Sequence, residues 1–177
     1  MSSLLAGIAV PFTLHLAFAF SAPSPAGEGA SCCALDLNAL SQKSCCELEA
    51  LFRAGTAAAP PCGYGRGKTL LLLDRPRPKA GASMANAVWK GKHFLPCGRM
   101  INQWAGFRAV GADVRVEPSA LDGKPCVLLD YPPDAPVFGG DFDEIREISP
   151  GLWIGRYSER CPCPHQKGWF ALDFRCN

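Results

Sequence analysis

Two charged residues in one candidate strand are the first candidates for chemistry in this sequence. Glu144 and Arg146 are separated by one residue, so both lie on one face of the strand, while Asp143 and Ile145 lie on the other. A charge that faces the interior of a protein is costly unless it is paired or used. Arg146 therefore either binds a carboxylate or polar head group of a ligand, which its planar guanidinium suits, or forms a structural pair with an acidic residue of a neighbouring strand.

His93 is a candidate general base. The period of two along a strand places His93 on the same face as Trp89 and Gly91. The sequence shows no evident partner for a catalytic pair, so a structural or surface role is the alternative. An enzyme with isomerase-like or cyclase-like activity on an apolar substrate would need acids and bases inside a pocket. The residues that could supply them are His93, Tyr131, Glu144 and Arg146.

A glycine-rich segment before Lys68 and Thr69 suggests a phosphate-binding loop. The P-loop requires a glycine where this chain has Cys62, and it opens a helix, whereas here a leucine-rich run with strand character follows. We therefore expect residues 63–68 to form a turn into a strand over residues 69–74.

Cysteine is abundant, with ten residues in a chain of 177. An even number permits disulfides if the chain is secreted, whereas a plastid stroma would leave the thiols free or regulated. The loop over residues 161–165 offers two thiols and an imidazole, but its prolines favour a plain or disulfide-tethered loop over a metal site. The sequence therefore predicts no metal and no cofactor.

Aromatic residues form the largest group of candidate ligand contacts. Buried rings dominate the packing of cores, so each has a structural alternative. Several rings that line one pocket would bind an apolar or conjugated molecule. The residues predicted to contact a ligand are Trp89, His93, Trp104, Tyr131, Glu144, Arg146, Trp153 and Tyr157.

The strands that must position these residues are indicated by alternating apolar and polar side chains. The clearest run has its apolar positions at Val110, Ala112, Val114 and Val116. Such alternation is typical of a strand with one buried and one solvated face. The last run alternates in the same way, with Phe170, Leu172 and Phe174 on its apolar side. The candidate strands cover residues 69–74, 88–94, 99–104, 107–117, 125–131, 142–148, 152–157 and 168–175.

The predicted fold is mainly β: a single antiparallel, lipocalin-like barrel of about eight strands with one N-terminal amphipathic helix over residues 36–54. The Asp122-Gly123 and Pro150-Gly151 pairs favour tight turns between antiparallel strands. Residues 75–83 contain two prolines and no apolar periodicity, which predicts a solvated loop. An eight-stranded barrel either holds one small ligand or is filled by side chains.

Three short motifs resemble those of small lipocalin-like barrels. They are the strand Trp89-Lys90-Gly91-Lys92-His93-Phe94, then Asp143-Glu144-Ile145-Arg146, then Leu152-Trp153-Ile154-Gly155. The chain is similar in particular to the uncharacterised proteins named for a G-x-W-x-G motif, over about residues 60–175. This resemblance implies a β-barrel and implies no activity.

The N-terminus is predicted to carry targeting signals. Residues 1–19 are largely apolar and end in Ala-Phe-Ala, which predicts a cleaved signal peptide, with an uncleaved anchor as the alternative. The following Phe20-Ser21-Ala22-Pro23 resembles the bipartite presequence of algae with secondary plastids. Residues 20–33 are then a transit-like or disordered segment, and residues 34–177 form the helix and barrel domain. We expect delivery to such a plastid through the endoplasmic reticulum, with secretion as the alternative.

Composition narrows the class of partner. The formal net charge is +2 and no stretch is densely basic, so nucleic acid is not an expected partner. Hydrophobic residues make up 48% of the chain, which predicts a folded domain, and no membrane span is expected after processing. We expect a binding module for a small hydrophobic molecule, such as a lipid or pigment. The alternatives are the small barrel enzyme and a structural or assembly factor with a filled barrel.

Overall fold

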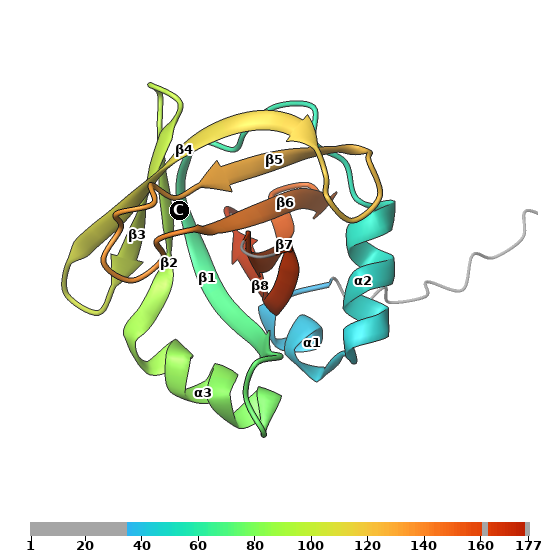
Figure 1. Ribbon diagram of the computed structural model, residues 1–177. Helices are drawn as coiled ribbons and strands as arrows, with labels where there is room; N and C mark the ends of the chain where they lie inside the picture. The colour runs from blue at the N-terminus through green and yellow to red at the C-terminus, as the bar shows by residue number, and fades with distance from the viewer. Residues whose placement is uncertain (1–34, 161–162, 176–177) are drawn as a thin grey trace, which may run out of the picture. The chain divides into compact units, whose positions relative to one another are not determined.

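The computed structural model describes residues 35–160 and 163–175, which form a closed, antiparallel, eight-stranded β-barrel (Figure 1). This confirms the predicted fold class. Each strand pairs with the next along the chain, and β8 pairs with β1 to close the barrel. The strands are β1 (Gly63–Leu72), β2 (Trp89–Leu95), β3 (Arg99–Trp104), β4 (Arg108–Pro118), β5 (Pro125–Asp130), β6 (Asp141–Ser149), β7 (Leu152–Glu159) and β8 (His165–Asp173).

Two helices precede the barrel where one was predicted. They are α1 (Leu37–Gln42) and α2 (Cys45–Ala54). The chain is extended at Lys43, and Ser44 begins α2 with a capping box in which the Glu47 side chain accepts from the Ser44 backbone N–H at 2.8 Å. A capping box satisfies N–H groups that a helix start leaves without partners, so it favours a new helix at this point.

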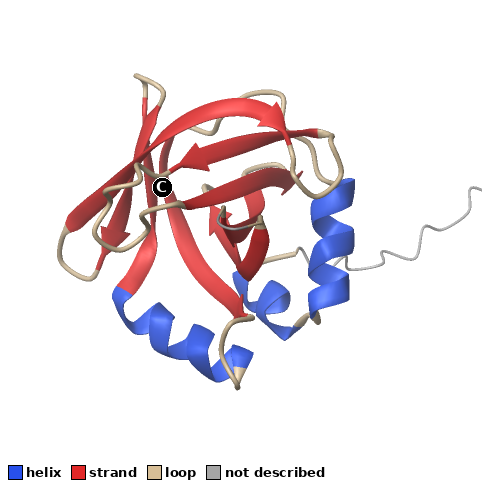
Figure 2. Ribbon diagram, in the orientation of Figure 1, coloured by secondary structure: helices blue, strands red, loops and turns tan. Residues whose placement is uncertain are grey.

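A third helix, α3 (Pro78–Val88), connects β1 to β2 and was missed, so the predicted loop over residues 75–83 is wrong from Pro78 onward. Proline is well accommodated in the first helical turn, where its missing N–H needs no partner. The apolar periodicity was absent because, of the α3 side chains, Ala82 alone is buried. All three helices lie outside the barrel (Figure 2).

Apolar side chains pack on both faces of part of the barrel wall. Inside the barrel, Phe170 and Leu172 of β8 belong to the interior core. On the outside, Ala171 of β8 packs with side chains of α1 and α2, including Leu40 and Phe52. The prediction that the Ala171 face of β8 is exposed to solvent is therefore wrong, because α1 and α2 pack on it.

The alternation along β4 is confirmed only in its middle. Ala112 is fully buried in the barrel core, and Val114 packs against that core. Val116 is 42% exposed, so its predicted burial is wrong. Val110 has a φ of +61° where the β3–β4 register shifts, which explains why a strict period of two fails there.

The glycine-rich segment over residues 63–68 is part of β1, so the predicted turn is wrong. A Cβ at Gly67 would lie 2.5 Å from the ring of Trp89. In β2, Gly91 has a φ of +139°, and a Cβ there would lie 2.1 Å from the carbonyl oxygen of Gly65. Glycine at these positions lets β1 and β2 approach closely and lets the Trp89 ring lie against the backbone.

Several sequence predictions fall wholly or partly outside the described residues. The signal peptide and transit-like segment over residues 1–33 do, as does Cys161 of the predicted cysteine loop, and these stay predictions. Within the described ranges no cluster of three or more potential metal ligands occurs, and no helix is long and apolar enough to cross a membrane. The free cysteines of the described residues are Cys45, Cys46, Cys62, Cys97, Cys126 and Cys163.

Candidate functional site

A cavity of about 420 Å³ lies in the barrel, near the end where α3 joins β1 to β2. Because successive strands are antiparallel, the same end carries the β3–β4, β5–β6 and β7–β8 connections, and we call it the α3 end. Val88 and Val137 line the cavity and are also exposed, so the cavity opens at the α3 end. An internal cavity argues against the filled barrel expected of a structural factor.

Stacked aromatic rings form one wall of the cavity. The ring of Trp104 is nearly parallel to that of Phe138, with centroids 6.1 Å apart, and also to that of Phe107, at 6.4 Å. The ring centroid of Phe138 lies 4.9 Å from that of Tyr131 and 5.9 Å from that of Tyr157. Flat aromatic walls of this kind suit a planar or conjugated apolar molecule.

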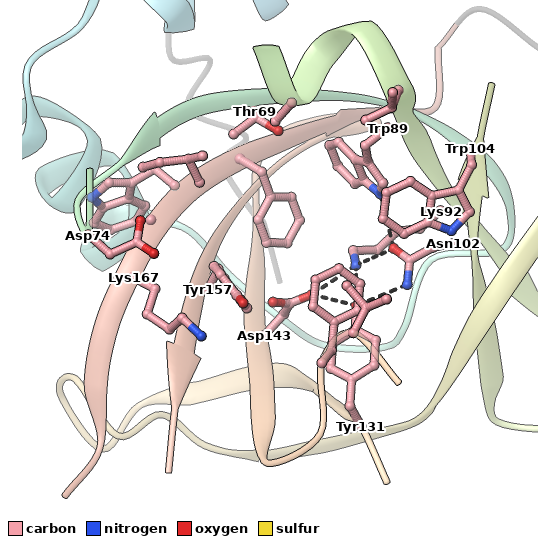
Figure 3. Close-up of a pocket in the computed structure, with 18 of the residues that line it drawn as sticks. Thr69, Asp74, Trp89, Lys92, Asn102, Trp104, Tyr131, Asp143, Tyr157 and Lys167 are labelled. Carbon is pink, nitrogen blue, oxygen red and sulfur yellow. Dashed lines mark hydrogen bonds and ion pairs between the residues drawn. The ribbon is translucent and has the colours of Figure 1, made fainter. Parts of the chain in front are cut away.

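A buried polar network forms another part of the wall (Figure 3). The Lys92 Nζ lies 2.8 Å from Asp143 Oδ2, and it donates to the Tyr131 hydroxyl at 2.6 Å and to Asn102 Oδ1 at 3.0 Å. The Tyr131 hydroxyl in turn donates to Asp143 Oδ2 at 3.1 Å. The Lys92 Nζ also lies 5.2–5.5 Å from the ring centroids of Trp89, Tyr131 and Phe170. The network therefore places an ion pair in aromatic surroundings.

Burial dominates the electrostatics of this network. It lowers the pKa of Lys92 and raises the pKa of Asp143, and the attraction between the two charges opposes both shifts. Burial, followed by the nearby Asp143 carboxylate, raises the pKa of Tyr131 well above its usual value. Tyr131 is therefore a neutral phenol that donates to Asp143.

A bulge in β2 points Lys92 into the barrel. The β2–β3 register shifts between Trp89 and Gly91, so Trp89, Lys92 and Phe94 all face inward. The predicted common face of His93 and Trp89 is therefore wrong, and His93 points away from the cavity. Its Nδ1 is buried and has no hydrogen-bond partner in the described part of the chain.

Asn86 connects α3 to β1 by side-chain hydrogen bonds. The Asn86 side chain accepts from the Thr69 N–H at 2.7 Å and donates to the Thr69 carbonyl at 2.9 Å. The β1–β8 register shifts just after Thr69, so the amide supplies backbone hydrogen bonds at an irregular point of β1. This pairing holds α3 in place, and Ala85 and Val88 of α3 line the cavity.

A second polar cluster reaches the same cavity through Tyr157 and Lys167. The Tyr157 hydroxyl donates to Asp141 Oδ2 at 2.5 Å, and the Lys167 Nζ lies 3.2 Å from Asp141 Oδ1 and 4.9 Å from the Tyr157 ring centroid. Burial and the hydrogen bond to Asp141 raise the pKa of Tyr157. Lys167 is partly exposed and is therefore a cation that an incoming ligand can reach.

Four of the eight predicted ligand contacts line the cavity: Trp89, Trp104, Tyr131 and Tyr157. The other four, His93, Glu144, Arg146 and Trp153, do not. Trp153 packs in the barrel core without lining the cavity.

Glu144 and Arg146 lie on the outer face of β6, and the inner face carries Asp143 and Ile145. Arg146 binds Asp122 through two contacts of 2.6 and 2.9 Å and donates to the Phe52 carbonyl at 3.1 Å, which joins β6 to the β4–β5 loop and α2. This is the structural alternative considered for Arg146, although its acidic partner comes from a loop.

Glu144 has a similar role beside Arg146. Its carboxylate pairs with Arg156 at 2.8 Å and accepts from the Ala120 N–H at 2.6 Å and the Ser119 hydroxyl at 3.1 Å. Both charges are thus engaged in contacts that fix the β4–β5 loop, so neither is available to a ligand in the cavity.

Among the cavity residues that the sequence interpretation missed are four of the polar side chains and one ring of the aromatic wall: Lys92, Asn102, Asp143, Lys167 and Phe138. For Lys92 a signal exists, because a glycine inside a strand often marks a bulge that changes which side chains face inward. For Asp143 the sequence left two faces to choose from, and charge alone gave no preference.

The fold and the cavity together define a small β-barrel with a ligand-sized internal pocket. No family model matches the chain, and no curated protein matches it. Among solved structures, a crystal structure of a protein from Thermomonospora curvata is similar, with a TM-score of 0.50 and 20% sequence identity over 74% of this chain and 87% of that chain. At this identity the likeness supports the barrel fold alone, and the resemblance to the G-x-W-x-G proteins stays a prediction.

Proposed function

We propose that the barrel binds one small, mostly apolar molecule, such as a lipid or a pigment, in the cavity beneath α3. One observation carries the proposal: the aromatic cavity of about 420 Å³, which contains a buried Lys92–Asp143 pair. Small-molecule pockets typically have ~300–1,000 Å³ and combine apolar walls with a few placed polar groups. This cavity has the same combination.

The wall suggests how such a ligand would lie. Its flat apolar part would pack on Trp104 and Phe138, whose rings are nearly parallel. Its polar group would lie near Lys92. The Lys92 contacts with Asp143, Tyr131 and Asn102 already use its three donors, so a ligand carbonyl or hydroxyl must replace one of them. We therefore favour a ligand with one acceptor group over a purely hydrocarbon molecule.

Binding can be tested by narrowing the mouth of the cavity. Ala85 of α3 lines the cavity, whereas Ser83, two residues away, is exposed and does not. We would measure the binding of β-ionone and of oleic acid to the purified chain by calorimetry. We expect Ala85→Phe to weaken binding at least tenfold and the matched control Ser83→Phe to leave it unchanged. No detectable binding of either probe, or equal binding by both variants, would contradict the proposal.

A second candidate is an enzyme that transfers a proton to or from an apolar substrate. The Lys92, Tyr131 and Asp143 cluster favours it, because burial shifts the pKa of each group and shifted acids and bases gather at catalytic sites. The test is deuterium exchange at the carbon beside the ketone of β-ionone, followed by proton NMR in D2O. We expect faster exchange with the protein, lost in Lys92→Met and kept in Lys167→Met. Exchange no faster than in buffer would exclude this activity for the probe.

A further inference from the structure

Exposed apolar side chains gather at the α3 end of the barrel. Of the seven large hydrophobic side chains that are exposed in the described residues, five belong to this end, and the other two, Leu95 and Val116, lie toward the opposite end. Met84 is 78% exposed and Phe107 is 58% exposed. We call the five the apolar rim: Leu73, Met84, Val88, Phe107 and Val137. Exposed apolar groups that gather at one end of a molecule indicate an interaction surface.

The rim follows the outer face of α3 and the mouth of the cavity. Met84 and Val88 lie four residues apart and so share one face of the helix. No charged residue occurs in α3 after Lys79. Val88 and Val137 line the cavity as well, so the rim and the cavity opening are continuous.

Basic side chains flank the rim. Arg75, Arg77 and Lys79 are exposed just before and at the start of α3, and the single acidic residue among them, Asp74, lies 3.8 Å from Arg75. Residues 73–88 therefore carry a net positive charge beside exposed apolar groups. An uncharged apolar helix face next to basic residues is the pattern of a segment that lies in the interface of an anionic membrane.

We propose that the α3 end docks on the surface of an anionic lipid bilayer, with the apolar rim among the upper acyl chains and the basic residues at the lipid phosphates. Docking there would turn the mouth of the cavity toward the phase in which apolar molecules are dissolved. This inference goes beyond the proposed ligand binding, because an empty barrel would dock in the same way.

The experiment is sedimentation of the full chain with vesicles of phosphatidylcholine alone and of phosphatidylcholine mixed with phosphatidylglycerol. We expect tighter binding to the mixed vesicles and a decrease with added salt. Met84→Asp should weaken binding at least tenfold, because it removes an apolar side chain that would enter the bilayer and adds a negative charge that the anionic lipids repel. Arg77→Glu with Lys79→Glu should weaken it by at least ~fivefold for each basic residue lost.

Val116→Asp is the matched control, because Val116 is also exposed and apolar but lies toward the opposite end of the barrel. It should leave vesicle binding unchanged. Equal binding to both kinds of vesicle, no sedimentation, or an equal loss in Val116→Asp would overturn the proposal. A dimer that Met84→Asp abolishes, without vesicle binding, would instead assign the rim to a second copy of the chain. Calorimetry with β-ionone on Met84→Asp, which does not line the cavity, tests ligand binding separately.

Discussion

The buried pair of Lys92 and Asp143 gives the sharpest test of the site. Both side chains are almost fully buried, with exposed fractions of 3% and 4%. Replacing Lys92 by methionine keeps most of the side-chain volume but leaves the Asp143 carboxylate with the Tyr131 hydroxyl and no cation. The variant therefore isolates the cost of an unpaired buried charge.

The expected cost is large. Removing one partner of a buried ion pair destabilises proteins by ~3–5 kcal/mol, out of a total stability of roughly 5–15 kcal/mol. Replacing both partners, as in Lys92→Met with Asp143→Leu, should recover most of the loss, because no charge then remains to be desolvated. In the single variant, burial raises the pKa of Asp143 without an opposing cation. The folded state then binds more protons than the unfolded state, so the variant loses stability as pH rises from 3.8 to the raised pKa.

Urea unfolding followed by tryptophan fluorescence measures these differences. We expect the stability gap between the native chain and Lys92→Met to be small at low pH, where Asp143 is protonated, and to widen as the pH rises. A loss below ~1 kcal/mol at neutral pH, or a double variant no more stable than the single one, would refute the description of this pair as buried and mutually dependent.

Three further predictions address the barrel around the site. Ala112→Asp places a carboxylate in the interior core and should cost several kcal/mol, whereas Asp113→Ser on the exposed face should stay within ~0.5 kcal/mol, as urea unfolding would show. The hydrogen bond from Arg146 lowers the pKa of Asp122 from 3.8 to about 2. This pair should therefore contribute ~2 kcal/mol to the free energy of unfolding above pH 3.8 and lose that contribution as the pH falls through 2. The Asp122→Asn variant should lack this pH dependence. Burial raises the pKa of Cys126 to about 12, so iodoacetamide should modify the exposed Cys97 and spare Cys126, as peptide mass analysis would show.

Much of the barrel could be predicted from local patterns. The limits of β3 agree with the prediction, and β2, β4, β5, β6 and β7 differ from it by at most two residues at either end. This succeeds because tight turns and alternating side chains are short-range signals. The helix α3 was missed because few of its side chains are buried, so its sequence shows little apolar periodicity. The predicted start of β1 was too late in the sequence, because the glycines there allow close packing of strands and do not form a turn.

The site was harder to predict, because it depends on which face of each strand turns inward. A single bulge between Trp89 and Gly91 exchanges the roles of His93 and Lys92. A one-residue change of register moves every later side chain to the other face, so local sequence cannot fix it without the pairing partner. The four cavity residues that were predicted correctly are all aromatic. Three of them lie near strand ends at the α3 end, where the cavity opens: Trp89, Trp104 and Tyr157.

The most direct test of ligand binding in the cavity uses three of the four tryptophans as reporters in one measurement. The chain is labelled with nitrogen-15 at the indole Nε1 of tryptophan, and NMR spectra are recorded as β-ionone or oleic acid is added. The account predicts that the signals of Trp89 and Trp104, which line the cavity, shift and saturate with the ligand, while that of Trp153, in the core away from it, stays unchanged. Spectra that remain the same with both ligands at saturating concentration, or a shift confined to Trp153, would contradict it.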